Sequence, residues 1–467
     1  MEEPELLAHT RGKQARLALR WLLLALAALL ASSLFALLLI VLRSMDLSHW
    51  LGGSAFFAVA IALHVNLAVL VWFLSFAGLL WSLPEDDRWQ AVSHGAWILA
   101  AFGTGLILLS PWLATPDFWG GATRTDPVVL SNYLPILRTP SFFAGLALFG
   151  GGILLLTLRT CAILWSKTPP TAGEVPNRTG LLVAAISLLL ALLALLHAAW
   201  NLRGEQPGVA YYETLFWGMG HLLQFLHTFL MLTVWLWLAP LAGLKLPLNA
   251  RLLRLVFVNG LLPALLSPLF FLVIHPNNSA YRLYFTQLMS YASWLAFPII
   301  GITIAWQWLR HAATDQLDRE QGIFRSYLLF SLFLFVLGIL IGSRIEGDSV
   351  MVTAHYHGTV GAVTMAYMGI TFHLLPRFGF RRPLGRWHQL QPYLYGGGLT
   401  LLILGLTGLG LYGVPRKTPL TAQATTLWES GGVALLGIGG AVGLLGSFLF
   451  LWLVFLSLRA GGDNRRP

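Results

Sequence analysis

The sequence contains a single cysteine, Cys161, among its 467 residues. One cysteine excludes an intrachain disulfide, an iron–sulfur cluster held by cysteines of this chain and a CxxCH attachment site for covalent haem. If the activity requires haem c, we therefore expect it on another subunit.

Charged residues are also scarce. They make up 10% of the chain against 57% hydrophobic residues, which is too little charge to cover a soluble globule of this length. A net charge of +10 is also found in proteins that bind nucleic acids. Here, however, Lys and Arg concentrate in the loops on the side of the membrane that the two termini share, as the positive-inside rule describes. We therefore expect a protein of the bacterial cytoplasmic (inner) membrane, embedded in the lipid bilayer, with both termini cytoplasmic and no nucleic-acid partner.

Twelve apolar stretches are long enough to span a bilayer. They cover roughly residues 17–42, 53–81, 94–114, 141–166, 178–200, 209–240, 253–275, 283–308, 325–343, 351–376, 391–413 and 430–459. The predicted fold is all-α: one integral-membrane domain of about twelve helices over residues 1–467, with cytoplasmic tails at 1–16 and 460–467. The chain contains no P-loop, Rossmann fingerprint or convincing repeat.

Acidic residues are missing from the interiors of these spans. Among the nineteen acids, Glu213, near the outer end of the sixth span, comes closest to the bilayer. Without buried carboxylates, uptake of protons from the cytoplasm would depend on hydroxyl groups, amides and water, so we do not expect proton pumping. Glu213 is either a route for protons from the outside or an ordinary interfacial residue. Glu346 and Asp348, just outside the tenth span, are either close to a bound group or ordinary loop acids.

Histidines, by contrast, do fall inside spans, and four of them lie at similar depth. His355 and His357 stand two positions apart in an apolar helix, so their side chains point about 200° apart and face different partners. By depth, His64 in the second span and His221 in the sixth also lie in the outer half of the bilayer. A low-spin haem needs two opposed imidazoles, which His64 and His357 can supply, and His355 would then bind a second haem. The alternative is buried histidines that bond to backbone carbonyls.

Three motifs carry a resemblance to a known family. HYHGTVGAVTMAYMGITFHLLP, which begins at His355, resembles the tenth helix of subunit I of the haem-copper oxidases, which include cytochrome c oxidases and nitric oxide reductases. LFWGMGH, ending at His221, resembles the sixth-helix stretch of that subunit. GVPRKTP, from Gly413 to Pro419, resembles its loop between helices eleven and twelve. The number of spans and the position of each motif agree with the family.

The resemblance implies roles for these histidines. His64 and His357 would ligate a low-spin b-type haem, and His355 would be the proximal ligand of a high-spin b- or o-type haem. His221 corresponds to the first ligand of the copper called Cu-B. The implied activity is respiratory: electrons pass through the first haem to the second, where a diatomic gas, O2 or NO, is reduced.

Arg416 and Lys417 correspond to the basic pair that binds haem propionates in the family. Two cations at the outer surface can pair with carboxylates and tune a haem potential. Because no soluble domain is present, the implied electron donor is a separate periplasmic cytochrome c or a cupredoxin-like subunit.

The copper site departs from the family pattern. The family places two adjacent histidines on the seventh helix, and alignment puts Phe270 and Phe271 there. His275 supplies one ligand if the loop is shortened, and otherwise caps the helix end. Phe225 stands four residues after His221, where oxygen-reducing members carry a tyrosine that donates an electron and a proton. Phenylalanine can donate neither, so Tyr291 or another phenol would have to supply them.

No other histidine completes the copper site in the sequence. His227 is rotated by about 240° from His221 on the same helix, and nothing in the sequence brings His197 close. One imidazole is too weak a donor set to retain copper. Two other function classes therefore stay open: a noncatalytic haem protein that binds a gas or passes electrons, and a metabolite transporter whose histidines line a pathway.

Overall fold

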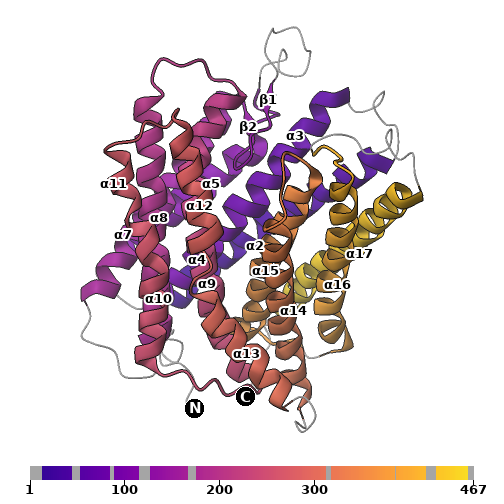
Figure 1. Cartoon of the computed structure of the whole chain (residues 1–467). Helices are drawn as coiled ribbons and strands as arrows, with labels where there is room; N and C mark the ends of the chain where they lie inside the picture. Colours follow the sequence, from indigo (N-terminus) through magenta and orange to yellow (C-terminus); the bar gives the residue numbers. More distant parts are fainter. Residues whose placement is uncertain are drawn as a thin grey trace. The chain divides into compact units, whose positions relative to one another are not determined.

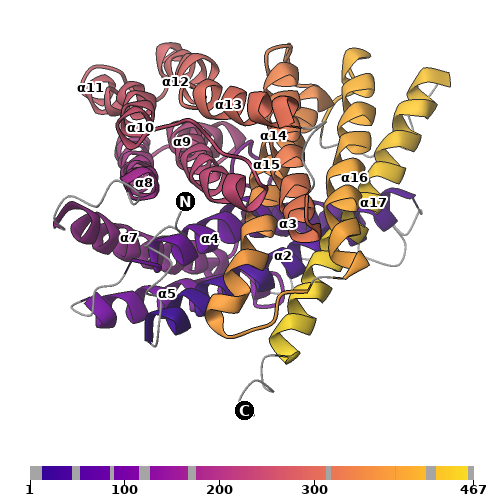
Figure 2. The ribbon, with the colours of Figure 1, turned by 90° about the horizontal axis from the view of Figure 1, so that it is seen from below.

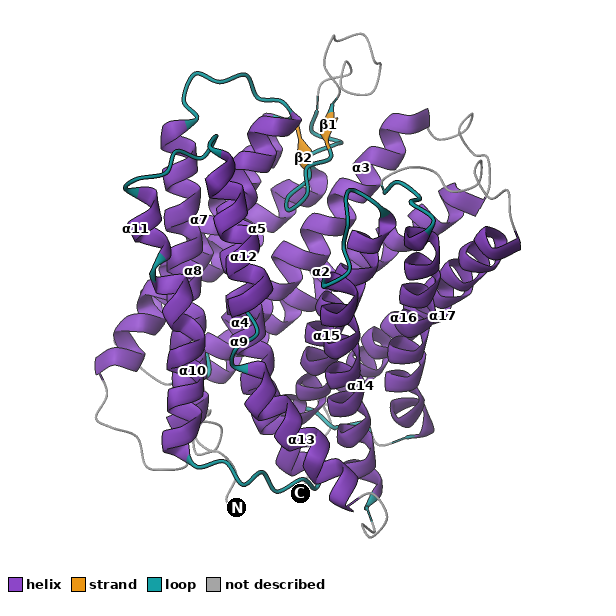
Figure 3. Cartoon of the chain, in the orientation of Figure 1, coloured by secondary structure: helices purple, strands orange, loops and turns teal. Residues whose placement is uncertain are grey.

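The computed structural model describes residues 13–44, 53–84, 89–114, 127–166, 175–311, 317–383, 385–416 and 427–460. These residues are almost entirely helical, with one two-stranded hairpin among them (Figure 3). The all-α prediction is confirmed.

The residues group into two compact units. The first comprises Met1–Ser32, Leu51–Thr233 and Pro247–Ile302, and the second Ser33–Trp50, Val234–Leu246 and Thr303–Pro467. The elements of the first unit are α3 (Gly53–Val65), η1 (Asn66–Val71), α4 (Trp72–Trp81), α5 (Gln90–Leu109), β1 (Val128–Val129), β2 (Ile136–Leu137), α7 (Pro140–Ser166), α8 (Val175–Asn201), α10 (Ala250–Leu265), α11 (Ser267–Phe271) and α12 (Ser279–Ala292). Those of the second are α14 (Arg319–Gly342), α15 (Val350–Leu374), η3 (Leu375–Phe378), α16 (Arg386–Leu411) and α17 (Leu427–Ala460). Three helices contribute residues to both units: α2 (Lys13–Ser44), α9 (Val209–Leu241) and α13 (Phe297–His311).

Within the described residues, twelve helical segments are long and apolar enough to cross a membrane. Each overlaps one predicted span, and most ends agree within a few residues. The chain is therefore a polytopic membrane protein of the predicted kind.

Two of these segments are interrupted, and proline accounts for both breaks. The span Ala250–Phe271 breaks at Leu266, two residues before Pro268. The span Ser279–Arg310 breaks between α12 and α13, just before Pro298. Proline lacks the amide hydrogen that continues a helix and disfavours helical geometry in the residue before it.

Glycines bring several helices into backbone contact. In the first unit α5 lies along α7 (Figure 2), and a Cβ built on Gly103 would lie 2.4 Å from the Phe149 nitrogen. In the second unit α16 lies along α17 (Figure 1), and a Cβ on Gly398 would lie 2.1 Å from the Gly443 nitrogen. Small residues at helix contacts are typical of membrane bundles, where close packing replaces the hydrophobic effect.

The hairpin lies beside α3 (Figure 1). Val128 pairs with Leu137 and Val129 with Ile136, and all four are buried. This short sheet was not predicted, since two-residue strands leave no periodic pattern in the sequence. It determines the position of Tyr133, which lies between the strands.

The contact between α16 and α17 predicts the effect of a minimal substitution. Gly398→Ala places a methyl group against the Gly443 backbone, and overpacking of this kind costs about 1–3 kcal/mol. Gly397→Ala is the matched control, because no atom lies within 4 Å of its Cβ position. We expect only Gly398→Ala to lower the free energy of unfolding in detergent. Equal effects at the two positions would contradict the packing.

Candidate functional site

His355 and His357 lie near the start of α15 in the second unit. The His355 Nδ1 atom lies 2.8 Å from the Gly338 carbonyl on α14, and the His357 Nδ1 atom lies 2.8 Å from the Thr353 carbonyl on its own helix. A carbonyl oxygen only accepts hydrogen bonds, so Nδ1 is the donor in both rings. Each neutral imidazole therefore carries its lone pair on Nε2, the tautomer that ligates a metal.

Two glycines on α14 let α15 lie close to it. A Cβ on Gly342 would lie 2.6 Å from the His355 Nδ1 atom, so this glycine makes room for the ring, and one on Gly338 would lie 2.7 Å from the Thr359 nitrogen. A larger side chain at either position would push the two helices apart. The GxxxG spacing of Gly338 and Gly342 is a signal for this contact that the sequence analysis missed.

His64 lies at the end of α3 in the first unit, and Ser32 on α2 determines its tautomer. The Ser32 carbonyl and hydroxyl oxygens each lie 3.0 Å from the His64 Nδ1 atom, and the hydroxyl also lies 3.1 Å from the His64 carbonyl. Donation of Nδ1–H to the Ser32 carbonyl again leaves the lone pair on Nε2.

A π-helical turn, η1, begins two residues after His64. Asn66, which begins it, is fully buried, and its side-chain amide donates to the carbonyls of Ala62 and Pro135 at 2.8 Å each. The second bond ties the His64 helix to the hairpin. π-Turns inside α-helices frequently accompany functional sites, and neither η1 nor Asn66 was predicted.

His221 lies on α9 in the first unit and is 2% exposed. Its Nδ1 atom donates to the Trp217 carbonyl at 2.7 Å. The Tyr133 hydroxyl lies 3.0 Å from Nδ1 and 3.1 Å from Nε2 of the same ring. The hydroxyl is thus nearly equidistant from the two nitrogens and lies over the ring, while Nδ1–H points to the Trp217 carbonyl.

The residues considered as further copper ligands beside His221 have contacts of their own. His275 is exposed, and its Nδ1 atom accepts from the Asn277 amide in the loop between α11 and α12. Phe270 stacks on Tyr284 with ring centroids 3.7 Å apart, and Phe271 stacks on His197 at 4.8 Å. Within the described residues, no three His, Cys, Asp or Glu side chains gather as metal ligands.

The other residues considered for this site are also placed. His227 contacts the Phe73 ring in a tilted arrangement, with centroids 4.8 Å apart. Phe225 is fully buried. Tyr291 is 71% exposed, whereas Tyr133 brings a phenol to His221 from the hairpin. The phenol beside His221 thus comes from the hairpin, which the spacing of residues along α9 could not predict.

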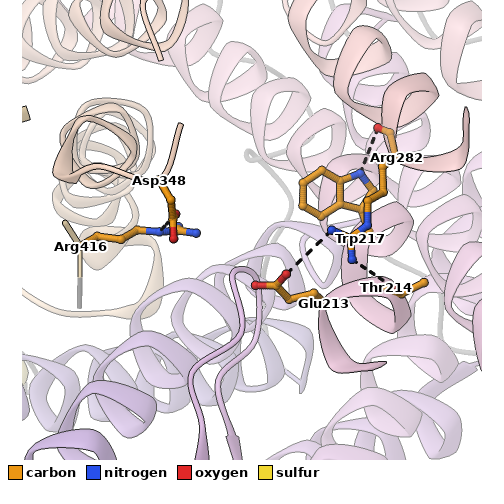
Figure 4. A network of polar contacts seen from close by, with 6 residues as sticks. All are labelled: Glu213, Thr214, Trp217, Arg282, Asp348 and Arg416. Atoms are coloured by element: carbon orange, nitrogen blue, oxygen red, sulfur yellow. Dashed lines mark hydrogen bonds and ion pairs between the residues drawn. The ribbon is translucent and has the colours of Figure 1, made fainter. Parts of the chain in front are cut away.

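Arg416 forms an ion pair with Asp348 in the second unit (Figure 4). An isolated bridge between Ser349 and Pro415 and the Val350 amide bond to the Val414 carbonyl hold the two loops together. The Arg416 side chain is 10% exposed and that of Asp348 73%. Lys417 lies outside the described residues.

Glu213 forms an ion pair with Arg282, with 4.0 Å between Glu213 Oε2 and Arg282 NH1 (Figure 4). Arg282 also donates to the Thr214 hydroxyl at 3.1 Å, and its carbonyl accepts from the Trp217 indole at 3.2 Å. The same Trp217 carries the carbonyl that orients His221. The proton-transfer role of Glu213 stays a prediction.

Two proteins of similar sequence are both uncharacterized. The chain is 26% identical to an uncharacterized protein of Rickettsia prowazekii (strain Madrid E) over 94% of this chain and 95% of that protein. It is 28% identical to an uncharacterized protein of Aquifex aeolicus (strain VF5) over 80% of this chain and 88% of that protein. No family model matches the chain.

The two bonds of Asn66 predict that the residue stabilises the first unit. Asn66→Leu leaves the Ala62 and Pro135 carbonyls without this donor, and we expect it to lower the free energy of unfolding by about 2–4 kcal/mol. Amide hydrogen exchange in the hairpin should accelerate as well. Asn259→Leu, at an exposed position of α10, is the control. An unchanged exchange rate at Ile136 would contradict the proposed anchoring.

Proposed function

We propose that the protein is a haem-containing respiratory oxidoreductase of the bacterial inner membrane. In this proposal His64 and His357 hold a low-spin b-type haem, and His355 holds a high-spin b- or o-type haem at which O2 or NO is bound and reduced. When bound, haem supplies iron that passes electrons and, where one axial position is open, binds a diatomic gas.

The observation that carries the proposal is the anchoring of Nδ1 in all three histidines. Metal-ligating histidines almost always donate their second ring N–H to a carbonyl, carboxylate or water, which sets the tautomer and raises ligand basicity. His94 makes the same bond to the carbonyl four residues earlier, at 2.9 Å, so a bond within one helix is not specific. His64 and His355 are more informative, because their carbonyls belong to neighbouring helices.

The donor set suits the two haems. Imidazole nitrogen is a common axial ligand of haem iron, and polar side chains inside membrane helices are costly enough to be functional by default. The positions of His355 and His357 on one helix, about 200° apart, support ligation of different haems. The chain's own contribution is to hold each ring in one tautomer and orientation.

The outer loops of the second unit suit a role beside the haem propionates. Arg416 is largely buried and already paired with a carboxylate, Asp348, which is the chemistry that a propionate offers. In the proposal Arg416 and Lys417 bind propionates, and a periplasmic cytochrome c or cupredoxin-like subunit delivers electrons on this side. Both termini would then be cytoplasmic, as the distribution of Lys and Arg favours.

A second candidate is a noncatalytic haem protein for gas binding or electron transfer. The surroundings of His221 favour it, since the family's additional copper ligands are replaced by Phe270 and Phe271, which stack on other rings. Retention of haem without multi-electron turnover would distinguish this candidate from a reductase.

Substitution of the histidines tests the assignment. His355→Ala should abolish binding of carbon monoxide and turnover of O2 or NO, while the low-spin spectrum survives because its two ligands remain. His64→Ala should remove the low-spin spectrum. His94→Ala is the matched control, with the same type of Nδ1 bond but no assigned haem. Persistent turnover in His355→Ala, or equal haem loss in His94→Ala, would overturn the assignment.

Arg416→Gln tests the propionate role. A cation near a haem stabilises the more negative, reduced state, so its removal should lower the midpoint potential of the nearby haem. Arg344→Gln, an exposed position at the outer end of the second unit, is the control. Redox titration followed by absorbance gives the midpoint potential of each variant. A midpoint potential of Arg416→Gln equal to that of the control would contradict the role.

A further inference from the structure

His221 has a different partner from the one that the family resemblance implies. We propose that no second metal is held there, and that the phenol of Tyr133 takes its place as the partner of the imidazole. The inference concerns the gas-reducing site and rests on the proposed function for that context. It replaces a metal centre with a buried imidazole and a half-buried phenol.

Two polar groups contact the His221 ring among the described residues. Nδ1 donates to the Trp217 carbonyl at 2.7 Å, and the Tyr133 hydroxyl lies over the ring, 3.0 Å from Nδ1 and 3.1 Å from Nε2. Nε2 is the only atom of this neutral ring that can ligate a metal. The phenol is therefore the polar side chain that the structure brings to this imidazole.

A glycine on α9 makes room for the Tyr133 ring. A Cβ on Gly220 would lie 2.2 Å from Tyr133 Cδ1, so only glycine at this position lets the ring lie against α9. A Cβ on Gly218, the first glycine of GMGH, would lie 2.5 Å from the Tyr281 hydroxyl. That glycine therefore makes room for a different tyrosine. The glycine next to His221 is thus explained by the tyrosine beside it.

The hairpin that carries Tyr133 is held by two bonds to other segments and one within its turn. Asn66 donates to the Pro135 carbonyl at 2.8 Å, and Arg138 donates to the Pro207 carbonyl at 2.9 Å. Within the turn, the Ser131 hydroxyl donates to the Leu134 carbonyl at 2.6 Å. These bonds hold the backbone from which the Tyr133 ring reaches His221.

The other aromatic rings that contact His221 in the described part of the chain offer no metal-binding atom. Trp217 and Phe285 approach the ring with centroids 4.9 and 6.0 Å away, and the Trp217 indole N–H is bonded to the Arg282 carbonyl. Copper and iron are retained by several nitrogen, sulfur or carboxylate donors, not by one imidazole and a neutral phenol. The donor set does not fit a second metal.

Metal analysis of the intact wild-type protein is the first test, on cells grown with added copper and iron. We expect iron equal to the haem content and no other transition metal in stoichiometric amount. One additional copper or nonhaem iron per chain that His221→Leu removes would overturn the proposal. The haem content is measured separately, so failure of the proposed function would appear as absent haem and not as an added metal.

A double-substitution cycle tests the hydrogen bond itself. Tyr133→Phe keeps the ring on Gly220 and should lower the thermal midpoint in wild type, but much less in His221→Leu, where the hydroxyl has already lost its acceptor. Tyr281→Phe is the matched control, a buried phenol on Gly218 for which additive effects are expected. Additive effects of Tyr133→Phe and His221→Leu would overturn the pairing.

Discussion

The cost of placing a neutral imidazole among apolar helices determines how this protein is packed. A buried polar group without a partner costs about 1–3 kcal/mol, and the partner here is a backbone carbonyl. His355 uses the Gly338 carbonyl, which it reaches because Gly342 lets the ring lie against α14. His64 uses Ser32 on α2. The same bonds that remove this cost also leave Nε2 as the atom that carries the lone pair.

The twelve spans could be predicted from the sequence because length and hydropathy suffice to define a membrane helix. The positions of His64, His221, His355 and His357 along their helices followed directly from those spans. The break at Leu266 was not marked in advance, although Pro268 signals it in retrospect. Local rules therefore gave the helices and the residues on them.

The contacts of the histidines were not predicted, because they join segments far apart in the sequence. Tyr133 reaches His221 from a loop 88 residues away, and Asn66 reaches Pro135 over 69 residues. Only the glycines left a trace in the sequence, as the GMGH spacing before His221 and the GxxxG spacing at Gly338. A glycine that excludes a Cβ indicates a close neighbour without saying which residue it is.

We propose that the three anchored histidines bind haem and that His221 pairs with Tyr133. The direct measurement is haem quantification of the purified full-length chain, with reduced-minus-oxidised and carbon monoxide difference spectra. We expect two haems per chain, one low-spin and one that binds carbon monoxide. A folded protein purified without haem from haem-replete cells would contradict this proposal and favour a transporter.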